Sequence, residues 1–318
     1  MTEQAVPTRA APDPSLGSKA RKLLAKRWVR FGARLLPLPI LALAIWKTKP
    51  GNVDLSHASG RLVAAALAIN FLLYLPVRAL RWRLALTSPP AMRQIFFAML
   101  EGFFVGAALG FGTGDAVRSM RLRRQAGSFA RDFGATMAER AAEIVALAIL
   151  LALATAMGCT GRWAYALSAA GIAGYIVVLA IGKRLLPALE GWPRLATVLR
   201  ATLAASTPKR AAGLTLLVLA GWMTEVVILM LALAAFGLPA HLSTALLILL
   251  GVNLAITIPG PPVNLGTFEA GVTAALMASG IASAPALTFA LSYHLLMAVP
   301  VILVGATIYL FRGGMRGA

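Results

Sequence analysis

The sequence predicts an all-α polytopic membrane protein, with about six full spans and two oppositely oriented re-entrant helical elements in an inverted-repeat-like arrangement. Three observations predict this class. The 318-residue chain is 59% hydrophobic and only 13% charged, and its mean hydropathy is +0.80. Apolar runs long enough for membrane helices recur along most of its length. The net charge of +19 fits loops anchored against anionic lipid head groups, and we expect no nucleic-acid partner.

The first 30 residues differ in composition from everything that follows. They are polar at first and then basic, and they contain no apolar core of their own. We expect residues 1–30 to form a basic, mobile cytosolic tail. Residues 31–312 are expected to form a single integral membrane domain, with halves of about 31–160 and 161–312, and residues 313–318 a second, short cytosolic tail.

The first apolar segment, Leu35 to Trp46, has two interpretations. Its short length and the small residues Ala42 and Ala44 resemble a signal-peptide core. A membrane span is the better interpretation, because the basic tail ahead of it is long for a signal peptide. Trp28 and Trp46 can also mark the two membrane interfaces.

Further apolar segments follow, and they cannot all be full spans. We expect them at 62–86, 95–111, 133–157, 164–181, 211–236, 245–258, 267–281 and 284–311. If every long segment crossed, the basic stretches 118–131 and 183–210 would lie outside, against the positive-inside rule. Suppose instead that segment 95–111 enters the membrane from the cytoplasm and returns to it, and that segment 245–281 enters from the opposite side and returns there. Then 25 of the 30 lysines and arginines lie on the cytoplasmic side. This topology has six full spans and both termini in the cytoplasm.

Two clusters of helix-breaking residues mark where these elements turn. The stretch TIPGPPVNLG, residues 257–266, places prolines inside apolar chain, where proline removes a backbone donor and clashes with the preceding turn. The stretch GFGTGD, residues 110–115, is also expected to break a helix, because its glycines permit a tight turn. We expect Thr267 and Asp115 to cap the helices that follow, with Glu269 in the first turn of the later one. Helix starts near the midplane would face an anion, and ordinary surface loops are the alternative.

Of the 11 acidic residues, Glu139, Glu143, Glu225 and Glu269 all fall within or at the edge of expected membrane helices. Burying a charge in hydrocarbon costs about 3 kcal/mol even on a lenient scale, so such groups should face a cavity or a partner. Glu139 and Glu143 share a helix face, and Arg140 can pair with a carboxylate of another helix. These groups form a polar network that holds helices together, or, in the case of Glu139 and Arg140, contact the substrate directly. Glu225 is the candidate for a cavity-facing or protonatable role. His294 could relay protons, but a lone membrane histidine more often joins helices by a hydrogen bond.

Four short runs, taken together, resemble a known family. They are RALRWR at 78–83, GDAVR at 114–118, ERAAE at 139–143 and PVNLGTFE at 262–269. In order and spacing they are similar to the flippase-like transmembrane domain of lysylphosphatidylglycerol synthases and its stand-alone relatives. The resemblance covers about residues 60–312. It implies a lipid translocase of the bacterial inner membrane.

Two features depart from the pattern of that family. The family usually shows a proline-glycine-glycine run where this chain has Pro261, Pro262, Val263 and Asn264, so the resemblance does not specify the shape of the turn. The soluble aminoacyl-transfer domain of the full synthases is absent from this sequence. We therefore expect a stand-alone member of the family without synthase activity.

The sequence thus predicts a lipid flippase or transporter that moves a phospholipid, a hopanoid or a polyprenyl-linked lipid between leaflets or towards export. We expect a multi-pass protein of the bacterial inner membrane, whose partners are its lipid substrate and anionic lipid head groups; a homo-oligomer is left open. The residues predicted to bind substrate are Gly114, Asp115, Arg118, Arg140, Gly266 and Thr267. Those predicted to form a coupling or polar network are Glu139, Glu143, Glu225 and Glu269.

The alternative is an integral membrane lipid-modifying enzyme or an accessory subunit of lipid or glycan biosynthesis. The sequence contains no DxD, DDxxD or HExxH pattern of the kind that holds a catalytic metal. Its single cysteine, Cys159, makes no metal cluster. We therefore expect no catalytic residues, no metal and no cofactor. Lipid movement by the purified protein in liposomes would separate a transporter from both alternatives.

Overall fold

The computed structural model describes residues 58–110, 112–126, 128–189, 191–257 and 262–314. Several sequence-based predictions lie outside the described residues. These are the N-terminal tail, the first span at Leu35–Trp46, the prolines of the second break up to Pro261, and most of the C-terminal tail.

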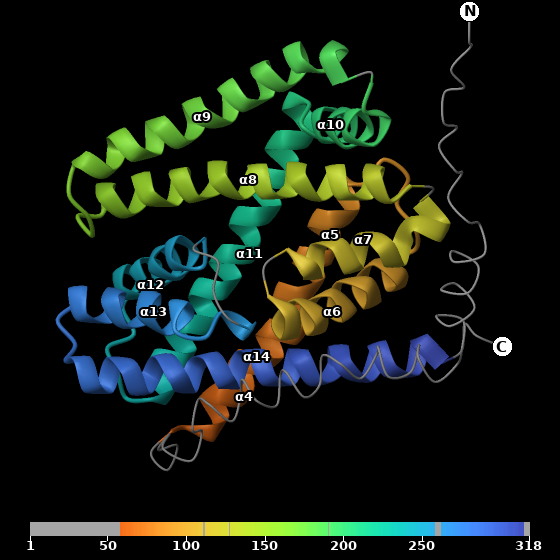
Figure 1. Cartoon of the computed structure of the whole chain (residues 1–318). Coiled ribbons are helices and arrows are strands. Elements are labelled where there is room, and N and C mark those ends of the chain that lie inside the picture. The colour runs from red at the N-terminus through yellow and green to blue at the C-terminus, as the bar shows by residue number, and fades with distance from the viewer. Residues whose placement is uncertain (1–57, 111, 127, 190, 258–261, 315–318) are drawn as a thin grey trace, which may run out of the picture.

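Within these ranges the chain consists of helices and turns, with no strand (Figure 1). The helices are α4 (Gly60–Ile69), the π-helix η2 (Asn70–Tyr74), α5 (Leu75–Ala85), α6 (Met92–Leu109), α7 (Thr113–Ala126), α8 (Phe129–Ala156), α9 (Trp163–Leu185), the 3₁₀-helix η3 (Pro187–Leu189), α10 (Pro193–Ala205), α11 (Pro208–Ala235), α12 (Leu242–Ala255), the 3₁₀-helix η4 (Pro262–Asn264), α13 (Thr267–Ala278) and α14 (Ser283–Gly314).

Five helices of the described chain are long and apolar enough to cross a membrane: α4 to α5 as one helix, α6, α9, α11 and α14. The predicted class, an all-α polytopic membrane protein, is confirmed. α8 has 28 residues, a length of about 42 Å at 1.5 Å per residue, but it contains five charged residues: Arg131, Asp132, Glu139, Arg140 and Glu143. The exact number of spans stays a prediction, since α6 is as long as a short span yet pairs closely with α7.

α4, η2 and α5 form one continuous helix with a widened turn in its middle. Pro76 lies in the first turn of α5 and has no N–H to donate to the turn before it. The π-helical turn Asn70–Tyr74 lies directly ahead of this proline and accommodates the missing hydrogen bond. The widened turn ends at Tyr74, whose hydroxyl reaches α11.

The first of two helix hairpins consists of α6 and α7, joined at residues 110–112. Gly110 and Gly112 have φ of +82° and +71°, which glycine adopts without strain. A Cβ atom on Gly114 would lie 2.6 Å from the carbonyl oxygen of Gly102, so the two backbones touch where these glycines face each other. The break predicted at residues 110–115 is therefore the turn of a tightly packed hairpin.

The second hairpin consists of α12 and α13 and is built in the same way. A Cβ atom on Gly271 would lie 2.7 Å from the carbonyl oxygen of Gly251, so glycine again permits close backbone contact. Its turn contains η4 and the break predicted at 257–266, of which residues 258–261 are outside the described chain. Each half of the chain thus contains one hairpin, and re-entry of the two from opposite sides stays a prediction.

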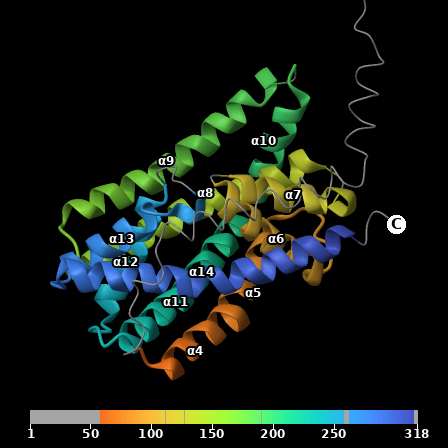
Figure 2. The same ribbon diagram turned by 60° about the horizontal axis from the view of Figure 1, so that its bottom comes forward.

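The two hairpins meet at their tips. Val263 of η4 packs on an apolar cluster that includes Phe104 and Ala108 of α6 and Ile302 of α14. In Figure 1, α12 and α13 approach from the left and α6 and α7 from the right, and α14 runs past both hairpins. Figure 2 shows the same crossing of α14 from another side. This opposed arrangement is the one expected of an inverted repeat.

Candidate functional site

A group of ionised side chains lies where α5, α7 and α8 pack together. We call it the arginine cluster and define it by Arg78 and Arg81 of α5, Asp115 and Arg118 of α7, and Glu139, Arg140 and Glu143 of α8. Charges of both signs are paired here in a mostly apolar molecule, which reduces the cost of burying each one.

Arg81 joins α5 to α8 through both carboxylates of one helix face. Its Nε donates to Glu139 Oε1 at 2.6 Å and its Nη2 donates to Glu143 Oε1 at 2.7 Å. Arg81 is 4% exposed and Glu139 1% exposed. The two acids lie four residues apart, so one guanidinium fork reaches both. Sequence analysis predicted the shared face of the acids, but it did not identify Arg81 as a site residue.

Arg118 joins α7 to the same carboxylate from the other side. Its Nη2 donates to Glu139 Oε2 at 2.7 Å and lies 3.1 Å from Asp115 Oδ1. The guanidinium carbon lies 4.7 Å from the centre of the Trp82 ring, a cation–π contact. With its side chain 8% exposed, Arg118 is enclosed by protein.

Arg140 occupies the open edge of the cluster. It donates to Asp115 Oδ2 at 2.9 Å and to Glu143 Oε2 at 2.8 Å, while its side chain is 45% exposed. The pairing with a carboxylate of another helix agrees with the expectation from sequence. Its guanidinium is the most accessible one among the paired arginines of the cluster.

Arg78 differs from the other three arginines because no carboxylate oxygen of the described residues lies within 4.0 Å of it. Its Nη1 donates to the hydroxyl of Tyr74 at 2.8 Å, and its guanidinium carbon lies 4.9 Å from the Phe103 ring centre. The Tyr74 hydroxyl in turn donates to Glu225 Oε2 of α11 at 3.1 Å. Glu225 therefore belongs to the same polar region, one hydroxyl away from Arg78.

Asp115 does not cap α7, which corrects one sequence-based expectation. The helix begins at Thr113, whose hydroxyl donates to the carbonyl oxygen of Gly110 at 2.6 Å. Asp115 lies in the first turn, where its carboxylate pairs with Arg118 and Arg140. Gly114, predicted to bind substrate, lies in the backbone contact with α6.

Thr267 does not cap α13 either. The capping position is Gly266, whose φ of +85° suits glycine, and Thr267 is the first helical residue. Glu269 Oε2 accepts the N–H of Gly266 at 2.7 Å, so that donor is already used. Glu269 and Gly266 thus form the start of α13, away from the arginine cluster.

Glu269 also reaches α14. Its Oε1 lies 2.7 Å from Nδ1 of His294, and both side chains are at least nine-tenths buried. The Phe268 ring stacks on the imidazole with 4.1 Å between ring centres. His294 is therefore an interhelical hydrogen-bonding residue, the commoner of the two roles considered from sequence.

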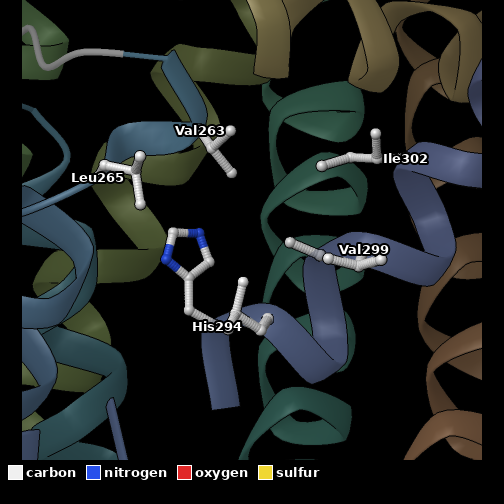
Figure 3. Close-up of a pocket in the computed structure, with 7 residues that line it drawn as sticks. Val263, Leu265, His294, Val299 and Ile302 are labelled. Carbon is white, nitrogen blue, oxygen red and sulfur yellow. The ribbon is translucent and has the colours of Figure 1, made fainter. Parts of the chain in front are cut away.

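A small hollow lies between η4 and α14 at the tip of the second hairpin, and we call it the tip hollow. Figure 3 shows the imidazole of His294 below Val263 and Leu265, with Val299 and Ile302 across from it. Leu295 and Ala298 also line it, and among the described residues of the lining His294 has the one polar side chain.

All seven residues of the arginine cluster come from three of the four runs on which the family resemblance rests. The fourth run, 262–269, forms the tip of the second hairpin and the start of α13. A family model described as the lysylphosphatidylglycerol synthase TM region matches residues 33–305. The chain belongs to this family. No curated protein and no solved structure matches the chain. Membership of the lysylphosphatidylglycerol synthase TM family confirms the suspected relationship and indicates a lipid-related function in a membrane.

Proposed function

We propose that this chain moves an amphiphilic lipid between the two leaflets of a bacterial inner membrane, with the phosphate of the head group bound at the arginine cluster. A phospholipid or a polyprenyl phosphate provides such a group. The lipid tails stay in the bilayer while the head group passes beside α5 and α8. Both chain termini are placed in the cytoplasm, as the distribution of basic residues favours.

The observation that carries this proposal is the position of Arg78. A cation in an apolar helix without a carboxylate partner is costly, and the Arg78 guanidinium carbon lies 5.5 Å from the ring centre of Tyr74 and 4.9 Å from that of Phe103. The other three cations of the cluster are matched by its three carboxylates. An incoming phosphate would supply the missing negative charge and accept two hydrogen bonds from the guanidinium fork.

Arg140 is the second arginine that we assign to the lipid, because its side chain is the most open of the paired ones. Arg118, Asp115 and Glu139 have their charges satisfied by each other and by Arg81, so we assign them to holding the helices in place. Glu143 belongs with them. Glu225 is connected to Arg78 through the hydroxyl of Tyr74, so anion binding at Arg78 would change the hydrogen bond that Glu225 accepts.

Reconstituted vesicles test this proposal. Fluorescent phosphatidylglycerol in the inner leaflet should become accessible to dithionite faster in vesicles containing the protein than in protein-free vesicles. Arg78→Gln should slow this by roughly ten- to a hundredfold, because a charge-assisted hydrogen bond contributes roughly 1.5–3 kcal/mol and each 1.4 kcal/mol is a factor of ten. Arg61→Gln, an exposed arginine at the start of α4, is the matched control and should have no effect. Equal rates for wild type and empty vesicles would contradict the proposal.

A further inference from the structure

Two hydrogen bonds in sequence link Arg78 of α5 to an acid of α11. The Arg78 guanidinium donates to the Tyr74 hydroxyl at 2.8 Å, and that hydroxyl donates to Glu225 Oε2 at 3.1 Å. A guanidinium has only donors, so the hydroxyl accepts from Arg78 and turns its own hydrogen towards Glu225. All three residues are half-buried, so none of them is sealed inside the protein. The charge of Arg78 and the carboxyl group of Glu225 are therefore one hydroxyl apart.

The charges around Arg78 depend on the state of Glu225. The arginine cluster combines four arginines with three carboxylates, which leaves one net positive charge. A net charge among apolar helices is costly. Two arrangements are neutral. In one, Glu225 is ionised and no anion is bound. In the other, Glu225 is protonated and a phosphate monoanion lies at Arg78.

The other charged and titratable groups near Glu225 keep their charge at neutral pH. Those close enough to act on it are Tyr74 of η2, Arg78 and Arg81 of α5, Glu143 of α8 and Tyr293 of α14. The two tyrosines are neutral, and Arg81 is paired with Glu143. α12 has no titratable residue. Arg61 of α4 lies near the contact of Ser59 with Ala235, about three turns along α11 from Glu225. Glu225 is therefore the group whose charge can respond to an anion.

We propose that Glu225 is a proton-binding site coupled to phosphate binding at Arg78, so that one proton moves with each lipid phosphate. The inference rests on the proposed function and names the ion that accompanies the lipid. A proton from water adds to Oε1 of the Glu225 carboxylate, because Oε2 accepts the Tyr74 hydroxyl. It returns to water when the phosphate leaves Arg78. By linkage, protonation strengthens phosphate binding as much as phosphate binding favours protonation.

The affinity for a phosphodiester at different pH values tests this coupling. The probe is dioctanoyl phosphatidylglycerol, whose single negative charge does not change over the range used. Its binding to the purified protein in dodecyl maltoside is measured by calorimetry from about pH 5 to about pH 9. Heat that remains with Arg78→Gln is subtracted as partition of the probe into micelles. The dissociation constant of wild type should rise with pH, by up to about tenfold per unit, because binding takes up one proton at most.

Variants of two acids identify the proton site. Glu225→Gln cannot titrate but keeps an acceptor for Tyr74, so its dissociation constant should be independent of pH and equal to the lowest value of wild type. Asp132→Asn is the matched control, since burial raises the pKa of Asp132 to about 6 and this residue lies outside the arginine cluster. It should keep the pH dependence of wild type. Glu225→Met, which is neutral and of similar length, replaces Glu225→Gln if that variant does not fold, and its affinity should likewise be independent of pH.

A wild type that binds the probe equally well at every pH would overturn the inference. A neutral variant of Glu225 that keeps the pH dependence of wild type would overturn it too. Neither result would contradict the proposed function, which requires only that the lipid binds at Arg78 and moves. Absence of wild-type binding at every pH would instead refute the phosphate site, and the coupling with it.

Discussion

Glu139 shows how single side chains hold this molecule together. One carboxylate, 1% exposed, accepts hydrogen bonds from Arg81 of α5 and Arg118 of α7 while belonging to α8. Three helices therefore depend on one buried charge. Such a group is stable only while its partners stay in place, because an unpaired buried charge is far more costly than a paired one.

Replacing Glu139 with glutamine should destabilise the fold by about 3 kcal/mol or more, since two arginines lose their shared partner. Thermal unfolding of the purified protein in detergent measures this. Glu143→Gln is the matched comparison, and it should cost less because its side chain is 19% exposed. An unfolding temperature of Glu139→Gln equal to that of wild type would show that the cluster does not hold the helices.

Asp132 gives a prediction about pH. It lies in the polar first turn of α8, ahead of the apolar stretch, and its Oδ2 has no hydrogen-bond partner among the described residues. Burial raises the pKa of Asp132 from 3.8 to about 6, opposed by nearby Arg131. The folded protein thus holds this proton more tightly than the unfolded chain, so stability should fall as pH rises from about 4 to about 6.

Asp132→Asn should remove that fall and should melt at a higher temperature than wild type at neutral pH. Unfolding temperatures at a series of pH values from about 4 to 8 test this. A wild type and a variant whose unfolding temperatures change with pH in parallel would contradict the assigned pKa.

The acids of the site were predictable from sequence, because a carboxylate in an apolar helix is rare and stands out. Arg78 and Arg81 offered the same signal, two arginines within one apolar helix, but near a segment end arginine can also extend to the membrane surface. Only the packing of α5 against α8 distinguishes these two cases. The separate role of Arg78 depends on which carboxylates lie within reach, and sequence spacing does not contain that information.

At the scale of elements, the two hairpins are packed in the same way. Facing glycines let the two helices of each hairpin touch, at Gly102 with Gly114 and at Gly251 with Gly271. The helix breaks were predictable because proline and glycine act through local backbone geometry. The helix starts were not, because the path of each turn, and not the capping preference of a side chain, decides that α7 begins at Thr113 and that Gly266 caps α13.

Gly266→Val should abolish lipid transport while leaving membrane insertion largely intact. Apart from its chain neighbours, no atom of the described residues lies within 4 Å of a Cβ placed there, so we expect the effect to come from the φ of +85° and not from a clash. Valine in that region costs about 1–2 kcal/mol, which the turn would relieve by shifting the start of α13. Transport in vesicles and the amount of inserted protein are the two measurements.

Gly280 provides a matched control for this change. It has a φ of +86°, also with nothing within 4 Å of a Cβ atom, and it lies in the turn between α13 and α14. Gly280→Val should lower stability by a similar amount but should retain transport. Equal transport by both variants would indicate that the second hairpin tip is an ordinary surface loop.

At the scale of the whole molecule, the basic loops predict a topology in which the two hairpins enter the membrane from opposite sides. The α7–α8 and α10–α11 turns are predicted to lie in the cytoplasm, and the α8–α9 turn, which contains Cys159, outside. The class of fold followed from composition alone. The meeting of the hairpin tips did not, because it depends on contacts between segments more than 150 residues apart, such as that of α6 with η4.

An impermeant maleimide tests this topology in intact cells. Native Cys159 should be labelled from outside, which makes it an internal positive control. With Cys159 replaced by serine, Ser128→Cys and Thr207→Cys should be shielded until the cells are opened. Strong labelling of either introduced cysteine in intact cells would overturn the six-span topology.

The central claim is that this chain moves a lipid head group past the arginine cluster, beside α5 and α8. We expect this movement to require the first hairpin, which carries Asp115 and Arg118, to shift against the second, and locking the two tips together tests it most directly. Ala107 of α6 and Val263 of η4 both pack on the apolar cluster between the tips. With both changed to cysteine and Cys159 to serine, a bis-methanethiosulfonate linker joins the hairpins. Movement of fluorescent phosphatidylglycerol, read by back-extraction with albumin, should stop on cross-linking and recover on reduction. Unchanged lipid movement in fully cross-linked protein would contradict the account.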